Sequence, residues 1–176
     1  MNRIAIANQK GGCGKTTTAI MTNNKGIYTV HEAAIRIIEQ ELRNKGDILP
    51  WINRDKFQKE VLKTQIEWEK EIPINIETAI LDRGIPDGTA YYRLDNLEPP
   101  KELMEAARKT NYKKIFLFDM LKFKNEGVRA EDEETQHKIY GIIKETYESL
   151  GYNPIRVPVI SPEERLDFIL EEIRKE

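Results

Sequence analysis

A glycine-rich stretch near the amino terminus contains the residues best suited to chemistry. It reads Lys-Gly-Gly-Cys-Gly-Lys-Thr-Thr and follows a short apolar run at residues 4–7. Glycines let the backbone approach a phosphate chain with its N–H groups turned inward, and a following helix adds the positive end of its dipole. Strand, loop and helix in this order are typical of a phosphate-binding loop; the alternative is a tight glycine turn without a ligand. We therefore expect eight consecutive residues to bind a nucleoside triphosphate such as ATP: Lys10, Gly11, Gly12, Cys13, Gly14, Lys15, Thr16 and Thr17.

Two side chains of this loop have roles that follow from their chemistry. Lys15 is expected to reach the β- and γ-phosphates, and Thr16 to place its hydroxyl on a Mg²⁺ ion. A carboxylate at a strand end can complete the magnesium shell, usually through water. Asp82 and Asp119 both follow apolar runs, and we prefer Asp82. For either residue, the alternative is a carboxylate that accepts backbone N–H bonds in a turn.

Four further residues are candidates for the acceptor side or for catalysis. Glu32 follows the second predicted strand, where a carboxylate can take the proton of a hydroxyl or simply favour the helix dipole. Arg83 suits bidentate anion binding, unless it forms a surface salt bridge. Asp87 contacts substrate or only forms a turn. Arg129 ends a polar, basic stretch that either closes over the phosphates or is a solvated loop.

Alternating strands and helices must position these residues. Apolar or β-branched runs predict strands at 4–7, 27–30, 78–81, 115–118 and 155–157. Helical spacing and capping residues predict helices at 16–25, 32–44, 53–71, 101–110, 131–150 and from residue 161 onward. Continuous apolar strands between helices indicate an α/β fold, with a parallel sheet covered on both faces. Ligands of such sheets lie at the carboxyl ends of the strands, so the candidates should share that edge.

Two of these helices also have a predicted apolar face. In the helix at 32–44 four residues are predicted to share one face: Ala34, Ile35, Ile38 and Leu42. In the helix at 53–71 four residues are predicted to form a buried stripe: Phe57, Val61, Leu62 and Ile66.

Composition narrows the class of protein. The chain has 176 residues, 39% apolar and 33% charged, with a net charge of −2. These values predict one domain over residues 1–176, a soluble cytoplasmic location, and no general affinity for nucleic acid or anionic membranes. No apolar run is long enough for a membrane span, and we expect no signal peptide. A single cysteine excludes an internal disulfide.

The loop itself departs from the strict phosphate-binding pattern. Gln9 stands where that pattern has a glycine, and Lys10 follows it. This arrangement resembles the deviant loop of the ParA/MinD family of dimerising ATPases, over residues 4–19. In that family a second lysine, matched here by Lys10, touches the phosphates of the other subunit. The resemblance implies a nucleotide-dependent dimer.

The rest of the chain resembles another branch of phosphate-loop proteins. Three stretches carry most of the likeness: Val-His-Glu-Ala-Ala-Ile-Arg from residue 30, Leu-Asp-Arg-Gly-Ile-Pro-Asp from residue 81, and Gly-Val-Arg-Ala-Glu-Asp from residue 127. They resemble small single-domain AAA-type ATP-binding proteins. Those proteins are similar to a kinase-like ATPase domain linked to NAD metabolism and to nucleoside and thymidylate kinases.

This second resemblance has structural and functional implications. It implies a three-layer P-loop NTPase with a five-stranded parallel sheet in the order 2-3-1-4-5. It also implies substrate-side helices near 45–75 and 85–110, and a lid near 120–135. By the match, Glu32 and the Asp82–Arg83 pair take the places of substrate and metal groups, and Arg129 falls in the lid.

Three functions follow. The leading hypothesis is an ATP- and Mg²⁺-dependent NTPase or kinase that transfers phosphate to water or to a small nucleoside-like acceptor, as a monomer or homodimer. The second is a ParA/MinD-like dimerising switch that uses Lys10 across its interface. The third is a nucleotide-binding module with little turnover.

Overall fold

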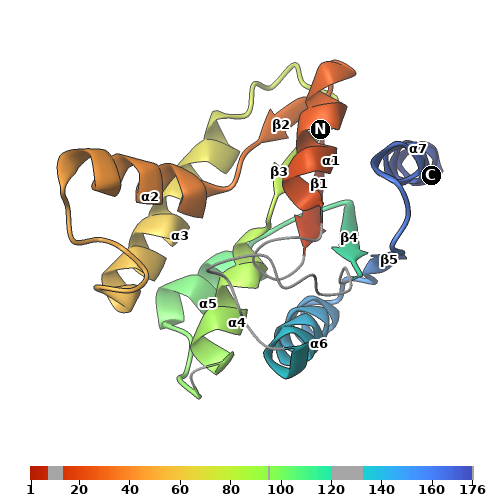
Figure 1. Ribbon diagram of the computed structural model, residues 1–176. Helices are drawn as coiled ribbons and strands as arrows, with labels where there is room; N and C mark the ends of the chain where they lie inside the picture. The colour runs from red at the N-terminus through yellow and green to blue at the C-terminus, as the bar shows by residue number, and fades with distance from the viewer. Residues whose placement is uncertain (8–13, 95, 120–132, 176) are drawn as a thin grey trace.

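Five parallel strands form a sheet at the centre of the protein (Figure 1). The computed structural model describes residues 1–7, 14–94, 96–119 and 133–175. All five predicted strands are present, and the sheet order β2-β3-β1-β4-β5 confirms the predicted order 2-3-1-4-5. The strands are β1 (Asn2–Ala7), β2 (Tyr28–Val30), β3 (Thr78–Asp82), β4 (Lys114–Phe118) and β5 (Ile155–Val157).

Helices connect these strands, as the alternating pattern predicts (Figure 1). They are α1 (Lys15–Asn24), α2 (Ala33–Asn44), α3 (Arg54–Glu71), the 3-10 helix η1 (Ile85–Asp87), α4 (Gly88–Leu94), α5 (Lys101–Arg108), α6 (Glu133–Ser149) and α7 (Pro162–Arg174). None of the helices in the described part of the chain is long and apolar enough to cross a membrane.

Side chains of β1 alternate between two apolar layers. Ile4 and Ile6 pack in one cluster with Ile169 of α7, while Ala5 packs in a second cluster with Ile143 of α6. Successive residues of a strand point to opposite faces, so a strand without polar residues needs helices on both sides. The result is the predicted three-layer α/β fold, with the core split by the sheet.

Helix ends follow the predicted capping chemistry. The Ser161 hydroxyl accepts the Glu164 backbone N–H (3.2 Å), and the Glu164 carboxylate accepts the Ser161 N–H (3.0 Å). Asn53 caps α3 by accepting the Lys56 N–H at 3.2 Å. Each bond satisfies a helix N–H that has no partner within the helix. These local signals set where α3 and α7 begin.

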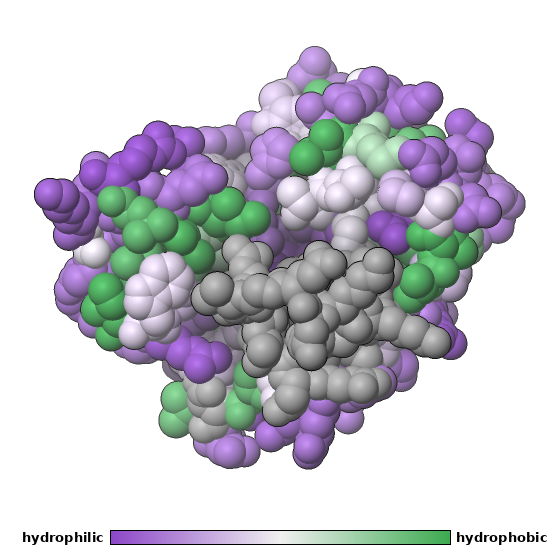
Figure 2. Space-filling view, in the orientation of Figure 1, coloured by the Kyte–Doolittle hydropathy of each residue, from purple (hydrophilic) through white to green (hydrophobic). Residues whose placement is uncertain are grey.

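The predicted apolar face of α2 is only partly covered. Ala34 and Ile38 are half-buried, whereas Ile35 is 44% exposed and Leu42 is 57% exposed. The buried residues of the helix are Ala33 and Ile37. Figure 2 shows hydrophobic side chains at the surface on the side of the molecule where α2 lies. Because α2 packs mainly on α3 and not on the sheet, its spacing alone does not tell which stripe is covered.

On α3, of the four residues predicted to form a buried stripe, only Phe57 is fully buried; Val61, Leu62 and Ile66 are half-buried. Two short helices, η1 and α4, have no counterpart in the residue-based prediction. The Ile-Pro-Asp-Gly segment has the composition of a turn, yet Ile85 and Pro86 are buried. Tertiary packing therefore overrides the turn signal there. The resemblance did imply helices near 85–110.

Candidate functional site

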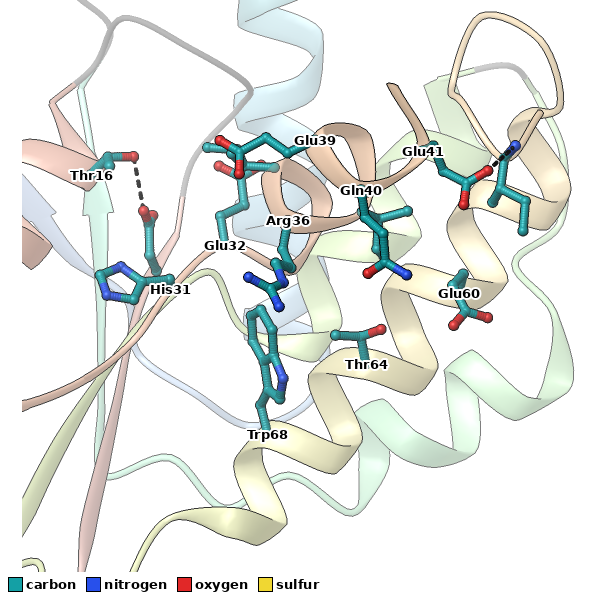
Figure 3. Close-up of a pocket in the computed structure, with 14 residues that line it drawn as sticks. Thr16, His31, Glu32, Arg36, Glu39, Gln40, Glu41, Glu60, Thr64 and Trp68 are labelled. Carbon is teal, nitrogen blue, oxygen red and sulfur yellow. Dashed lines mark hydrogen bonds between the residues drawn. The ribbon is translucent and has the colours of Figure 1, made fainter. Parts of the chain in front are cut away.

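Three strand ends bring the predicted site residues to one edge of the sheet. Thr16 is the second residue of α1, which comes after β1; Glu32 follows β2, and Asp82 ends β3. All three line a cavity of about 810 Å³ that also lies between α2 and α3 (Figure 3). Sharing one edge is what a parallel sheet requires of residues at the carboxyl ends of its strands.

A hydrogen bond joins the two predicted magnesium residues. The Thr16 hydroxyl donates to Asp82 Oδ2 at 2.9 Å, which is the dashed line beside Thr16 in Figure 3. Asp82 is only 2% exposed, and its other oxygen, Oδ1, has no hydrogen-bond partner among the described residues. Burial raises the pKa of the Asp82 carboxyl, and the positive charge of Lys15 opposes that rise. A hydroxyl beside a buried, half-satisfied carboxylate fits the oxygen chemistry that Mg²⁺ prefers.

Asp119, the rival magnesium residue, is engaged elsewhere. Its carboxylate accepts the Arg156 Nε–H at 2.8 and 3.0 Å, and its backbone N–H donates to the Val157 carbonyl. It therefore ties β4 to β5, as a structural residue does. Asp82 has the contact with Thr16, which agrees with the preference from sequence.

Only part of the phosphate-binding loop lies in the described residues. Lys10, Gly11, Gly12 and Cys13 fall outside them, as do Arg129 and residues 120–132 of the predicted lid. Lys15 is the first residue of α1 and is buried, whereas Thr17, two residues further along the helix, is exposed.

Gly14 has a left-handed backbone that favours glycine, with φ of 85°. A Cβ atom at this position would collide with Arg165 of α7. The Arg165 guanidinium donates to the carbonyls of Gly14 (3.4 Å) and Ile160 (3.0 Å) and lies 5.3 Å from the centre of the Phe118 ring. Sequence reasoning missed Arg165, because the 151 residues that separate it from Gly14 leave no local signal.

Glu32 and Arg83 form a buried ion pair. Arg83 Nε lies 2.9 Å from Glu32 Oε1, in the geometry of an ion pair and not of a straight hydrogen bond. Glu32 occupies the N-cap position of α2, but its side chain makes no capping bond to the described residues. The carboxylate thus faces the site, and the pair is not the surface salt bridge that was the alternative for Arg83.

The backbone of Arg83 is held in an unusual conformation. Its φ is 93°, which non-glycine residues rarely adopt. Its N–H donates to the Ile6 carbonyl (3.1 Å), its carbonyl accepts the Gln65 amide (2.8 Å), and its Nη1 donates to the Tyr91 hydroxyl (2.6 Å). Strain of this kind persists where the surroundings over-determine it, and it is concentrated at functional sites.

Asp87 is buried and not a surface turn former. It is 2% exposed, and the Tyr147 hydroxyl of α6 donates to its Oδ1 at 2.7 Å. Burial raises the pKa of the Asp87 carboxyl to about 7, against the opposing effects of Arg83 and of the Tyr147 hydrogen bond. A carboxyl perturbed in this way inside a pocket is a candidate functional group.

A second, smaller pocket of about 90 Å³ brings the three predicted acceptor residues together. Its walls include Glu32, Arg83 and Asp87, and α3 and α4 add Gln65 and Tyr91. Sequence reasoning missed Gln65, Tyr91 and Tyr147. Tyr91 stands four residues after Asp87, which is the one local hint; the others come from distant helices.

A known protein family matches most of this chain. The family model described as an AAA domain, AAA_28, matches residues 11–165. The chain belongs to this AAA domain family. No curated protein matches the chain. The family match confirms the kinship that the second resemblance implies.

Solved structures show the same fold at low identity. Thymidylate kinase from Ehrlichia chaffeensis has a TM-score of 0.69 and 11% identity, over 98% of this chain and 98% of that one. Deoxyadenosine kinase from M. mycoides with bound dATP has a TM-score of 0.62 and 16% identity, over 98% of this chain and 100% of that one. NadR protein in complex with NR has a TM-score of 0.70 and 14% identity, over 99% of this chain and 51% of that one. These matches confirm a kinase-like P-loop fold and give no support to the ParA/MinD-like switch.

Proposed function

We propose that this protein is an ATP- and Mg²⁺-dependent phosphotransferase that acts on a small nucleoside-like acceptor. The observation that carries the proposal is the position of Glu32, which lines both the large cavity with Thr16 and Asp82 and the small pocket with Arg83 and Asp87. A donor site and an acceptor site that share one carboxylate are what phosphoryl transfer needs, since it depends on positioning and electrostatics. The kinases among the structural neighbours support the same class of reaction.

On the donor side, the chain's own residues bind and neutralise the phosphates. The loop from Gly11 to Thr17 cradles the phosphate chain, and Lys15 balances charge on the transferred group. Thr16 and Asp82 would hold Mg²⁺, and the unpartnered Asp82 oxygen fits that role. Magnesium, when bound, supplies positive charge to the phosphates. Arg129, outside the described residues, is proposed to add charge from the lid.

On the acceptor side, Glu32 orients the attacking group. Arg83 holds its carboxylate at 2.9 Å, so the orientation is set before substrate arrives. α3 and the η1–α4 segment supply the substrate-side walls, near the regions 45–75 and 85–110. If water takes the acceptor position, the same groups support NTP hydrolysis. A module with little turnover remains the alternative when no acceptor is phosphorylated.

A labelled-phosphate assay tests the proposal. Parent protein with γ-labelled ATP, Mg²⁺ and a panel of nucleosides and nucleotides should transfer label, and Lys15→Ala should lose at least about 100-fold in rate, as removal of a pre-organised charge does. Lys25→Ala, which changes an exposed lysine at the other end of α1, is the matched control. Equal activity of Lys15→Ala and the parent would contradict the assignment.

A further inference from the structure

We infer that the acceptor is an uncharged, hydroxyl-bearing molecule of the nucleoside class and not a phosphorylated one. This inference rests on the proposed phosphotransferase function and narrows it. The structural neighbours include enzymes named for a nucleoside and for a nucleotide, so the fold alone does not decide between the two. The charges and the unsatisfied polar atoms of this chain's pocket do decide.

Among the described residues of the small pocket, the buried basic group already has an acidic partner. Arg83 is that group, and its Nε lies 2.9 Å from Glu32 Oε1. Asp87 adds a second carboxyl to this pocket. Arg54, the other described basic residue that lines it, lies at the exposed start of α3. A phosphate group would have to displace Glu32 from Arg83 or lie beside two carboxyls, and like charges at close range cost several kcal/mol.

The larger cavity next to it is acidic as well. Figure 3 shows carboxylates from α2 and α3 around the space that leads away from Thr16. Among the described lining residues, the basic side chains are Arg36 and His31. The acidic ones are Glu32, Glu39, Glu41, Glu60 and Asp82. Mg²⁺ and the phosphate-binding loop would offset the charge of ATP in this cavity, whereas the described lining residues offer a phosphorylated acceptor only Arg36 and His31.

Two buried atoms of the small pocket lack partners among the described residues. They are Arg83 Nη2 and Asp87 Oδ2, on side chains that are more than nine-tenths buried. An unpaired buried polar atom costs free energy, so a ligand that reaches both atoms, once a shift of the pocket wall uncovers them, is favoured. Arg83 Nη2 can only donate, whereas Asp87 Oδ2 accepts when ionised. A hydroxyl, or two neighbouring hydroxyls of a sugar, can accept from Arg83 and donate to Asp87. A phosphate dianion can only accept, so it could pair with Asp87 Oδ2 only when that carboxyl is protonated.

With a hydroxyl acceptor, every bond, electron pair and proton of the transfer step is accounted for. A bond forms between the hydroxyl oxygen and the γ-phosphorus, and the bond from that phosphorus to the β–γ bridging oxygen breaks. ADP leaves with the electron pair, and the hydroxyl proton passes to Glu32, the carboxylate that lines both cavities.

Matched pairs of acceptors test the inference. Label transfer from ATP is measured with each of several nucleosides and with its own 5′-monophosphate. At least one nucleoside should exceed its monophosphate by about 100-fold or more in kcat/KM, which is the effect of a like-charge penalty of a few kcal/mol. Transfer to monophosphates with equal or higher efficiency would overturn the inference but leave the phosphotransferase proposal intact. ATP hydrolysis with no transfer to any acceptor would overturn both.

A second measurement tests the role of Asp87 in binding. Asp87→Asn should raise KM for the preferred nucleoside about tenfold while KM for ATP stays unchanged, because one charge-assisted hydrogen bond to the acceptor is lost. The same variant should also reduce the ratio of kcat/KM for the nucleoside to kcat/KM for its 5′-monophosphate. Asp167→Asn, an exposed aspartate of α7, is the control. An unchanged nucleoside KM would overturn the assignment of Asp87, and equal losses with ATP and nucleoside would indicate a purely structural role.

Discussion

Individual side chains at the site make contacts that are costly unless a ligand completes them. Arg83 combines a left-handed backbone with a buried ion pair, and Asp82 and Asp87 each keep one buried oxygen without a described partner. Such features lower stability, so they persist where binding or catalysis needs them. The predictions at this scale concern the two aspartates.

Asp82→Asn should weaken magnesium dependence. Loss of the carboxylate that contacts Thr16 should raise the Mg²⁺ concentration for half-maximal activity by roughly 10–100-fold, the usual cost of disturbing a metal's supporting shell. A magnesium titration of ATP turnover measures this change. Asp119→Asn is the matched control, since its exposed pair with Arg156 contributes little. If Asp119→Asn showed the larger shift, the two aspartates would be assigned the wrong way round.

Asp87 should make stability fall as pH rises. Its pKa is about 7 in the folded protein and near its ordinary value of 3.8 when unfolded. The folded state therefore binds the proton more tightly, and stability from this group declines between about pH 4 and pH 7. The free energy of unfolding of the parent minus that of Asp87→Asn should drop over this window, by roughly 4 kcal/mol at most. Denaturant unfolding at several pH values measures it, and a flat difference would contradict the buried state.

At the scale of elements, α7 acts on the phosphate-binding loop from the far end of the chain. Its capping box fixes where the helix begins, and Arg165, four residues after Ser161, then reaches the Gly14 carbonyl. The start of α7 and the end of the loop are thus coupled through one arginine. Packing between α1 and α7 maintains that contact.

Ser161→Ala should destabilise the protein by about 1 kcal/mol, because the Glu164 N–H loses its acceptor. Ser161→Gly is the matched control, since glycine at an N-cap costs only a few tenths of a kcal/mol. Chemical denaturation at fixed pH distinguishes the two variants. If alanine and glycine proved equally stable, the capping box would contribute nothing to α7.

At the scale of the whole molecule, the sequence left two alternatives. The protein is either a dimerising switch or a kinase-like domain. The family match over residues 11–165 and the fold that the chain shares with solved kinase structures favour the kinase-like domain. The ParA-like resemblance is confined to residues 4–19, and its second lysine, Lys10, lies outside the described residues.

Nucleotide should not change the oligomeric state. Size-exclusion chromatography with ATP and with ADP should give the same elution volume, because the proposed chemistry needs no residue from another subunit. Lys10→Ala should keep the ability to transfer phosphate, while Lys15→Ala loses it. An ATP-dependent shift to a dimer, abolished by Lys10→Ala, would instead support the dimerising switch.

Local sequence determined the parts of this protein that depend on neighbours in the chain. Apolar runs predicted every strand, and capping residues predicted the starts of α3 and α7. The loop pattern made Lys15 and Thr16 candidates for phosphate and magnesium binding. The resemblance supplied the strand order, which no local pattern contains. These features follow from short-range sterics and hydrogen bonding, so they are visible in a linear sequence.

Tertiary structure alone decided which functional groups meet. The pairs Thr16–Asp82, Asp87–Tyr147 and Gly14–Arg165 are 66, 60 and 151 residues apart. Packing also chose the buried face of α2 and folded the turn-like segment at residues 85–87 into η1. The physical reason is that burial and charge pairing depend on what the whole sheet and its helices bring together. The loop predicts where donor phosphates bind, and only the fold shows that Glu32 lines both the cavity of Thr16 and Asp82 and the small pocket of Arg83 and Asp87.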